Sequence, residues 1–167
     1  PQLELPLFLY NMPAHTKVSF SVETIKRLAQ NPKVIGFKDS SANGSYFQSV
    51  VYAMRDRKDF SIFVGPEEMT AEAVMMGASG GVNGGANLFP KLYVDLYHAA
   101  KAMDQDKVRQ LQQKVMQVCA TIYSNGKYGS SYLKGLKSAL SVVGICSDVL
   151  ASPYREFDGE HKEIIKR

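Results

Sequence analysis

The sequence contains no tryptophan, only two cysteines and only three histidines among its 167 residues. His15, His98 and His161 lie far apart, so their spacing suggests no metal site and no metal is expected. Cys119 and Cys146 have no CxxC neighbour, and both lie in apolar patterns typical of helices. We therefore expect two buried free thiols, a reducing compartment and a cytoplasmic location.

Long apolar runs and clusters of one charge are also missing. No uninterrupted apolar stretch approaches the ~18 to 20 residues of a membrane span, and the start shows no secretory signal. The net charge of +4 is small and the basic residues are scattered, which argues against a nucleic-acid surface. The expected partner is therefore a small molecule rather than a nucleic acid or a membrane.

Apolar segments of strand length alternate with amphipathic segments in the first half of the chain. Strands are predicted near 5–10, 34–38, 60–65 and 80–83. Helices are predicted between them, one capped by Ser21, one from about Ser45 and one over 67–76. The strands lack polar alternation, which is typical of a parallel sheet buried between helices.

The pattern changes to helices after Pro90. They are expected at about 90–103, 105–123 and 130–143, before a polar tail from Pro153. Four βα units followed by helices favour an α/β fold that is half of a (β/α)8 barrel. A small open α/β sheet is the alternative.

Half a barrel would span residues 1–89, with the final barrel helix and a helical region in 90–167. Such a half leaves two strand edges and an apolar interior open. The chain also begins in PQLELPLFLYNMP, without an initiator methionine. We therefore expect the N-terminal part of a longer protein to be missing, or this piece to associate with another half.

The predicted strand ends carry the candidates for chemistry, because functional groups of parallel α/β folds gather at that edge. Tyr10 and Lys38 end the first two strands, and Gly65 and the segment 82–85 end the others. A lysine in a dry pocket has a lowered pKa and becomes a nucleophile. Its Schiff base with a ketone is an electron sink, and a tyrosine hydroxyl can shuttle the proton.

Each of these residues also has an ordinary interpretation. A lysine at a strand end is usually solvated or ion-paired, and Asp39 is an obvious candidate partner. A lone tyrosine such as Tyr10 is usually a core ring with its hydroxyl at the rim. The glycines could permit tight packing or bind a phosphate. The residues alone leave these alternatives open.

Three motifs occur in order along the chain, YNMP at 10–13, IGFKDSS at 35–41 and GASGGVNGGAN at 77–87. Together they resemble the dihydrodipicolinate synthase / N-acetylneuraminate lyase family over essentially the whole chain. The resemblance implies strands five to eight of a TIM barrel followed by C-terminal helices. It also implies a class I lyase, an aldolase or dehydratase of pyruvate or a related 2-keto acid or keto-sugar acid. It implies no cofactor. It also implies a homo-oligomer, either a dimer or a tetramer.

The resemblance assigns roles to four residues of this sequence. Lys38 falls on the Schiff-base lysine and Tyr10 on the tyrosine that relays protons. Val82 matches a residue of the eighth strand whose carbonyl faces the site, and Gly65 lies where the family leaves space for substrate. The family's carboxylate-binding loop and second tyrosine are expected in the absent N-terminal half.

His15 departs from the synthase branch, which usually has an arginine there to hold a substrate carboxylate. A neutral imidazole cannot replace a bidentate guanidinium, so the departure disfavours authentic dihydrodipicolinate synthase. His15 is then either a specificity residue or a surface histidine. Asn83 and Ser40 are further candidate substrate contacts, whereas Asp39 should point to the opposite face of its strand.

Two functions of other classes stay open. A non-catalytic family member would bind and sense a keto acid without forming an imine. A phosphate-binding module would use the glycine-rich segment 80–85, and its binding would survive the substitution Lys38→Ala. Aldolase and dehydratase are not distinguished, because both begin with the same imine.

Overall fold

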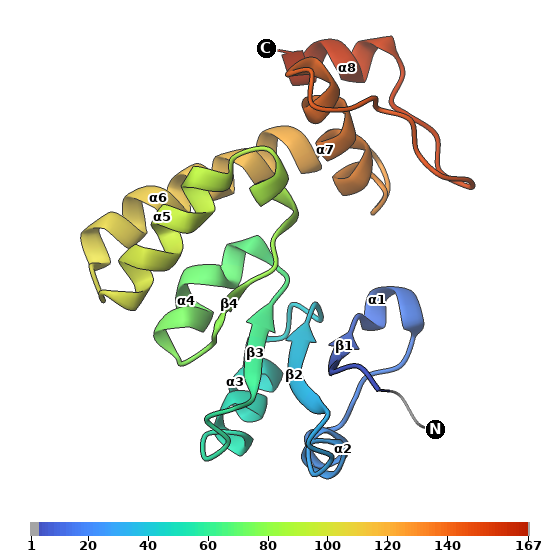
Figure 1. The fold of residues 1–167 in the computed structure, drawn as a ribbon. Helices are drawn as coiled ribbons and strands as arrows, with labels where there is room; N and C mark the ends of the chain where they lie inside the picture. The colour runs from blue at the N-terminus through green and yellow to red at the C-terminus, as the bar shows by residue number, and fades with distance from the viewer. Residues whose placement is uncertain (1–3, 167) are drawn as a thin grey trace.

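The computed structural model describes residues 4–166 and is built around one parallel sheet (Figure 1). The strands are β1 (Leu7–Asn11), β2 (Val34–Asp39), β3 (Ser61–Val64) and β4 (Gly80–Gly81). They lie in chain order, each parallel to the next. The predicted parallel α/β sheet is therefore confirmed, with a fourth strand shorter than expected.

Helices connect the strands and then form the C-terminal part. The first four are α1 (Pro13–Thr16), α2 (Val22–Leu28), α3 (Gly44–Ala53) and α4 (Thr70–Met75). The short 3₁₀ helices η1 (Glu67–Met69) and η2 (Gly84–Asn87) follow β3 and β4. The C-terminal helices are α5 (Pro90–Lys101), α6 (Gln105–Val118), the π-helical turn η3 (Cys119–Tyr123), α7 (Ser131–Val142) and α8 (Gly159–Lys166). In Figure 1, α7 and α8 lie at the end of the molecule far from α2 and α3.

Several local details test the sequence predictions. The cap at Ser21 is confirmed, since its side chain accepts a hydrogen bond from the Thr24 backbone N–H at 3.1 Å. The predicted polar tail contains the helix α8, whose first turn Asp158 caps by accepting the His161 backbone N–H at 3.0 Å. The predicted burial of Cys146 was wrong, because it lies exposed in the segment beyond α7.

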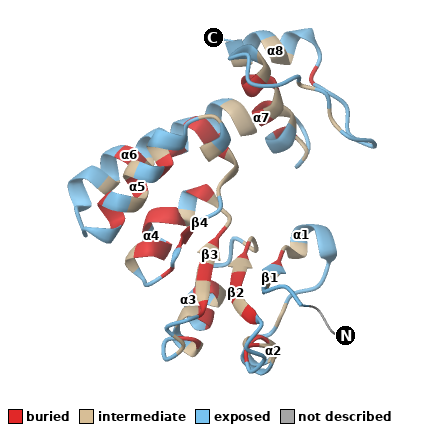
Figure 2. Ribbon diagram, viewed as in Figure 1, coloured by how far each residue is buried: buried red, intermediate tan, exposed pale blue. Residues whose placement is uncertain are grey.

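Two apolar clusters hold the elements together (Figure 2). The first packs α2 and α3 against one face of the sheet and includes Ile25, Phe37 and Phe47, each at most 1% exposed. The second lies among α4, α5 and α6 around Leu96 and Val115, both 0% exposed. Among residues 4–166, helices therefore cover one face of the sheet.

The opposite face of the sheet is open. Phe8 is 45% exposed and its ring covers Gly36, where a Cβ atom would lie only 2.1 Å from the ring. The rings of Phe8 and Phe63 lie 5.7 Å apart on this face. Within residues 4–166, β1 and β4 each have a strand neighbour on one side only, so both outer edges are unpaired.

A polar contact is buried beneath this face. Asn11 and Asp39 are each 1% exposed, and the Asn11 amide donates to the Asp39 carboxylate at 2.8 Å. The Asn11 side-chain oxygen accepts the Phe20 backbone N–H at 3.1 Å. Asp39 also accepts from the Ser41 hydroxyl at 2.8 Å. These contacts fix β1, β2 and the segment before α2 relative to one another.

We predict that Asn11→Ala lowers the free energy of unfolding by about 1–3 kcal/mol, because it leaves buried partners without hydrogen bonds. Urea denaturation of the natural full-length protein measures this loss. The exposed control Gln30→Ala should stay within about 0.5 kcal/mol of the wild type. An Asn11→Ala variant as stable as the control would contradict the role assigned to this contact.

Tyr46 provides a pH-dependent test of the same region. Its hydroxyl donates to the Phe20 carbonyl at 2.7 Å, and burial and the negative charge of Asp39 raise its pKa to about 12. This pKa lies above the value of about 10 in the unfolded chain. The contribution of Tyr46 to stability is therefore fully present below about pH 10. The contribution is lost as the pH rises through about 12.

We expect the phenolate absorbance difference between the wild type and Tyr46→Phe to have its midpoint near pH 12. In concentrated urea the same difference should have a midpoint of about 10. Equal midpoints in the two conditions would mean that Tyr46 is not in the environment described.

Candidate functional site

The register of the first two strands brings the two main candidates together. Tyr10 on β1 is paired with Lys38 on β2, and the Lys38 Nζ atom lies 4.4 Å from the centroid of the Tyr10 ring. Among the described residues, Lys38 has no ion-pair partner. The amine and the phenol are therefore neighbours on the open face of the sheet.

Asp39 does not compete for this amine. Its carboxylate is buried on the other face, where Asn11 and Ser41 donate to it. The predicted orientation is confirmed, because successive side chains of a strand alternate between faces. The ordinary interpretation, in which Asp39 pairs with Lys38, does not hold.

Ser40 and Gly65 complete the edge beside the tyrosine. The Ser40 hydroxyl donates to the Tyr10 hydroxyl at 3.4 Å, a long contact. A Cβ atom on residue 65 would lie 2.1 Å from the Ser40 oxygen, so a larger residue at this position would displace the Ser40 side chain. The glycine at the end of β3 therefore leaves the space that Ser40 occupies.

A cavity of about 270 Å³ connects these groups. Its lining residues are Tyr10, Met12, Lys38, Ser40, Gly65, Pro66, Glu67, Glu68, Val82, Tyr123 and Tyr132. Five of the seven residues proposed from the sequence therefore line one cavity at the carboxyl edge of the sheet.

The remaining two proposed residues do not line this cavity. His15 is exposed on the short helix α1. The Asn83 amide donates to the Gly65 carbonyl at 3.0 Å, so it supports the cavity edge from behind. The structure gives neither residue a direct place beside Lys38.

Sequence inspection missed the other wall of the cavity, which is organised by Glu67. This residue is 3% exposed, and its carboxylate accepts the Gly85 backbone N–H at 2.7 Å and the Tyr123 hydroxyl at 3.1 Å. The Tyr93 hydroxyl donates to the same carboxylate. Three donors from distant parts of the chain thus converge on one buried charge.

The tyrosines around Glu67 are held in their neutral form. Burial, followed by hydrogen bonding to Glu67 and its charge, raises the pKa of Tyr93 far above its usual range. Burial and the charge of Glu67 do the same to the pKa of Tyr123. The pKa of Tyr132 rises to about 12, again through burial first and Glu67 second. All three hydroxyls are therefore protonated at neutral pH.

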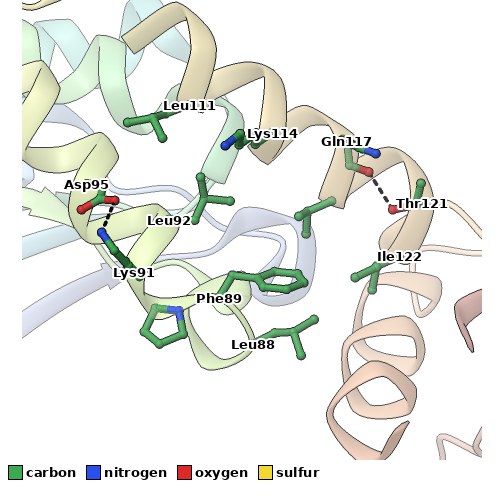
Figure 3. Close-up of a pocket in the computed structure, with 12 residues that line it drawn as sticks. Leu88, Phe89, Lys91, Leu92, Asp95, Leu111, Lys114, Gln117, Thr121 and Ile122 are labelled. Carbon is green, nitrogen blue, oxygen red and sulfur yellow. Dashed lines mark hydrogen bonds and ion pairs between the residues drawn. The ribbon is translucent and has the colours of Figure 1, made fainter. Parts of the chain in front are cut away.

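A second, larger cavity of about 830 Å³ lies away from this chemistry, in a groove between α5 and α6 (Figure 3). Its walls are largely apolar and include Phe89, Leu92 and Ile122. The Lys91 ammonium at its rim is paired with Asp95 at 2.7 Å. Lys114 also lines this groove, but no tyrosine is among its described lining residues. The smaller cavity, where an amine and a phenol lie together, is therefore the better candidate for catalysis.

Two features are absent from residues 4–166. No group of three or more His, Cys, Asp or Glu side chains in this range is arranged to hold a metal ion. No helix in the same range is long and apolar enough to cross a membrane.

Comparison with known proteins identifies relatives over the whole chain. The chain is 30% identical over 160 residues to a 4-hydroxy-tetrahydrodipicolinate synthase of Trichlorobacter lovleyi, covering 96% of this chain and 53% of the relative. It is 28% identical over 164 residues to N-acetylneuraminate lyase 2 of Escherichia coli, covering 98% of this chain and 51% of the relative. The solved structure of a dihydrodipicolinate synthase from Bacteroides thetaiotaomicron matches with a TM-score of 0.95 and 65% identity. The match covers 98% of this chain and 55% of that structure.

The chain thus spans about half the length of the relatives that it matches. The model of the dihydrodipicolinate synthetase family matches residues 1–167, and the chain belongs to this family.

Proposed function

We propose that this chain carries the imine-forming part of a Schiff-base lyase that acts on pyruvate or a related 2-keto acid. The proximity of Lys38 and Tyr10 carries the proposal, because an amine without an ion-pair partner in the described part of the chain lies 4.4 Å from the ring centroid of a phenol. The names of the relatives, synthases and a lyase, support the same class of activity.

In the proposed reaction, the Lys38 amine attacks the C2 carbonyl of the keto acid, and loss of water gives the imine. The protonated imine withdraws electrons from the bond between C3 and its next substituent. Tyr10 relays the proton that leaves or enters during cleavage or dehydration. Ser40, in contact with the Tyr10 hydroxyl, is placed to pass that proton on.

We infer that the sheet is the C-terminal half of a (β/α)8 barrel. The open face around Phe8 and the unpaired edges of β1 and β4 are what such a half presents. The half-length match to the relatives supports this arrangement. The missing half would then cover Lys38 and bring the carboxylate-binding loop.

4-Hydroxy-tetrahydrodipicolinate synthesis is the second candidate, favoured by the 65% identity to the Bacteroides enzyme. His15 in place of the usual arginine disfavours it. A phosphate module based on residues 80–85 is disfavoured by charge, because Glu67 and Glu68 line the cavity and the Gly85 N–H is already bonded to Glu67. An assay for 4-hydroxy-tetrahydrodipicolinate separates the first two candidates.

Borohydride reduction in the presence of pyruvate is the direct test, performed on the natural full-length protein. We expect a reduced pyruvyl adduct on Lys38 by peptide mass mapping, and none in Lys38→Arg. The other lysines of the same digest serve as internal controls. Pyruvate binding without any adduct would contradict the lyase and favour the keto-acid sensor.

Tyr10→Phe separates imine formation from proton transfer. Because the ring is kept and only the hydroxyl is removed, we expect the Lys38 adduct to form as in the wild type. Exchange of the pyruvate methyl protons with D₂O, followed by NMR, should slow by about 10²–10⁴-fold. Tyr52→Phe, at an exposed tyrosine outside the cavity, is the matched control. Unchanged exchange in Tyr10→Phe would remove this residue from the mechanism.

A further inference from the structure

The hydroxyls of the three tyrosines around Glu67 do not have equal freedom, because Tyr93 is buried whereas Tyr132 is 40% exposed. Tyr93 and Tyr123 both donate to Glu67, so neither is available to a ligand. The Tyr132 hydroxyl has no hydrogen-bond partner within residues 4–166, although this residue lines the cavity that contains Lys38. Of these three hydroxyls, that of Tyr132 is therefore the one that can donate a hydrogen bond to a ligand.

The position of Tyr132 is fixed from two sides. Its ring packs edge-on against Tyr123, with centroids 4.6 Å apart and an interplanar angle of 66°. Its hydroxyl rests on Gly84, where a Cβ atom would lie 1.7 Å from the oxygen. Because Glu67 holds both Tyr123 and the Gly85 turn, this one carboxylate anchors both supports of Tyr132.

The charge of the cavity restricts which ligand groups can bind beside Tyr132. Lys38 is the only cation among the lining residues, and the imine would use it. Glu67 and Glu68 contribute negative charge to the other wall, so a second carboxylate on the ligand is repelled there. A neutral hydroxyl accepts a hydrogen bond from a tyrosine without this penalty.

We propose that Tyr132 is a specificity-determining residue whose hydroxyl donates to a hydroxyl oxygen on the carbon chain beyond the imine, with Glu67 as its positioning residue. This inference rests on the proposed function, because it assumes a 2-keto acid bound at Lys38. It assigns the C-terminal helices a part in choosing the substrate, while β1 and β2 carry the chemistry.

The test compares two keto acids of equal length, 2-keto-3-deoxygluconate and 2-oxohexanoate, with pyruvate as the short reference. The natural full-length protein is titrated with each, and the concentration giving half-maximal borohydride-trapped adduct on Lys38 is measured. The six-carbon adduct and any pyruvyl adduct from cleavage are counted together. The wild type should require about five- to tenfold less of the hydroxylated acid.

Tyr132→Phe should remove this preference and leave the half-saturating concentration of pyruvate within about twofold. Gly84→Ala should have the same effect with Tyr132 intact, because the new methyl group displaces its hydroxyl. Tyr128→Phe, at an exposed tyrosine of the preceding loop, is the matched control and should keep the preference. Thermal unfolding midpoints show whether each variant is folded.

The outcomes separate the two proposals. A wild type without preference, or a preference unchanged in Tyr132→Phe, overturns the assignment of Tyr132 while pyruvate trapping upholds the lyase. Absence of any pyruvyl adduct on wild-type Lys38 overturns the lyase and the assignment of Tyr132 with it.

Discussion

The hydrogen bond between Asn11 and Asp39 is the contact on which the candidate site depends. It joins β1 to β2 at the residues that directly follow Tyr10 and Lys38 in sequence. Side chains alternate along a strand, so a register slip of one residue would move the amine or the phenol to the helix-covered face. A buried carboxylate that requires its amide partner penalises that slip, because burying a charge without hydrogen bonds is costly. The polar pair below the sheet thus specifies the position of the candidate pair, Lys38 and Tyr10, above it.

Glu67 has the corresponding role for the other wall. Its carboxylate gathers a turn after β4, a tyrosine on α5 and a tyrosine in η3, which lie up to 56 residues from Glu67 in sequence. No cation balances this buried charge in the contacts described for Glu67, so hydrogen bonds alone compensate for its desolvation. Hydrogen bonds to a charged acceptor are stronger than neutral ones, which makes three of them an effective anchor. The C-terminal helices are thereby joined to the strand ends.

Much of this arrangement could be predicted from the sequence, and the reasons are local. Apolar strand segments, the Ser21 cap and the position of Tyr10 and Lys38 at strand ends all appear within short windows. Neighbouring parallel strands then bring the two residues to one edge without further information. The exposure of Cys146 was mispredicted because its apolar neighbours, such as Ile145, are themselves exposed beyond the end of α7.

The wall formed by Glu67 and Tyr132 could not be predicted in this way. In the sequence, Glu67 stands beside Glu68 at a helix start, where acidic residues are common and usually solvated. Nothing within its window indicates that tyrosines from α5 and η3 will enclose it. A signal does exist in hindsight, because a Cβ atom on Gly85 would collide with the hydroxyls of Tyr93 and Tyr123, and one on Gly84 with that of Tyr132. Adjacent glycines of this kind indicate that another part of the chain packs closely against the backbone, but they do not indicate which residue does so.

The open face of the sheet sets the condition under which this chemistry can operate. Tyr10 is 50% exposed and Phe8 is 45% exposed, so water reaches the side of the sheet that carries the amine. Imine formation expels water and is reversed by it, and electrostatic interactions in the site weaken when water remains. A lyase built on Lys38 therefore requires a cover over Phe8 and Tyr10. The same cover would pair the edge of β1, which has no neighbour of its own on that side within residues 4–166. One covering element would thus satisfy both the folding requirement of the edge and the requirement of the proposed chemistry.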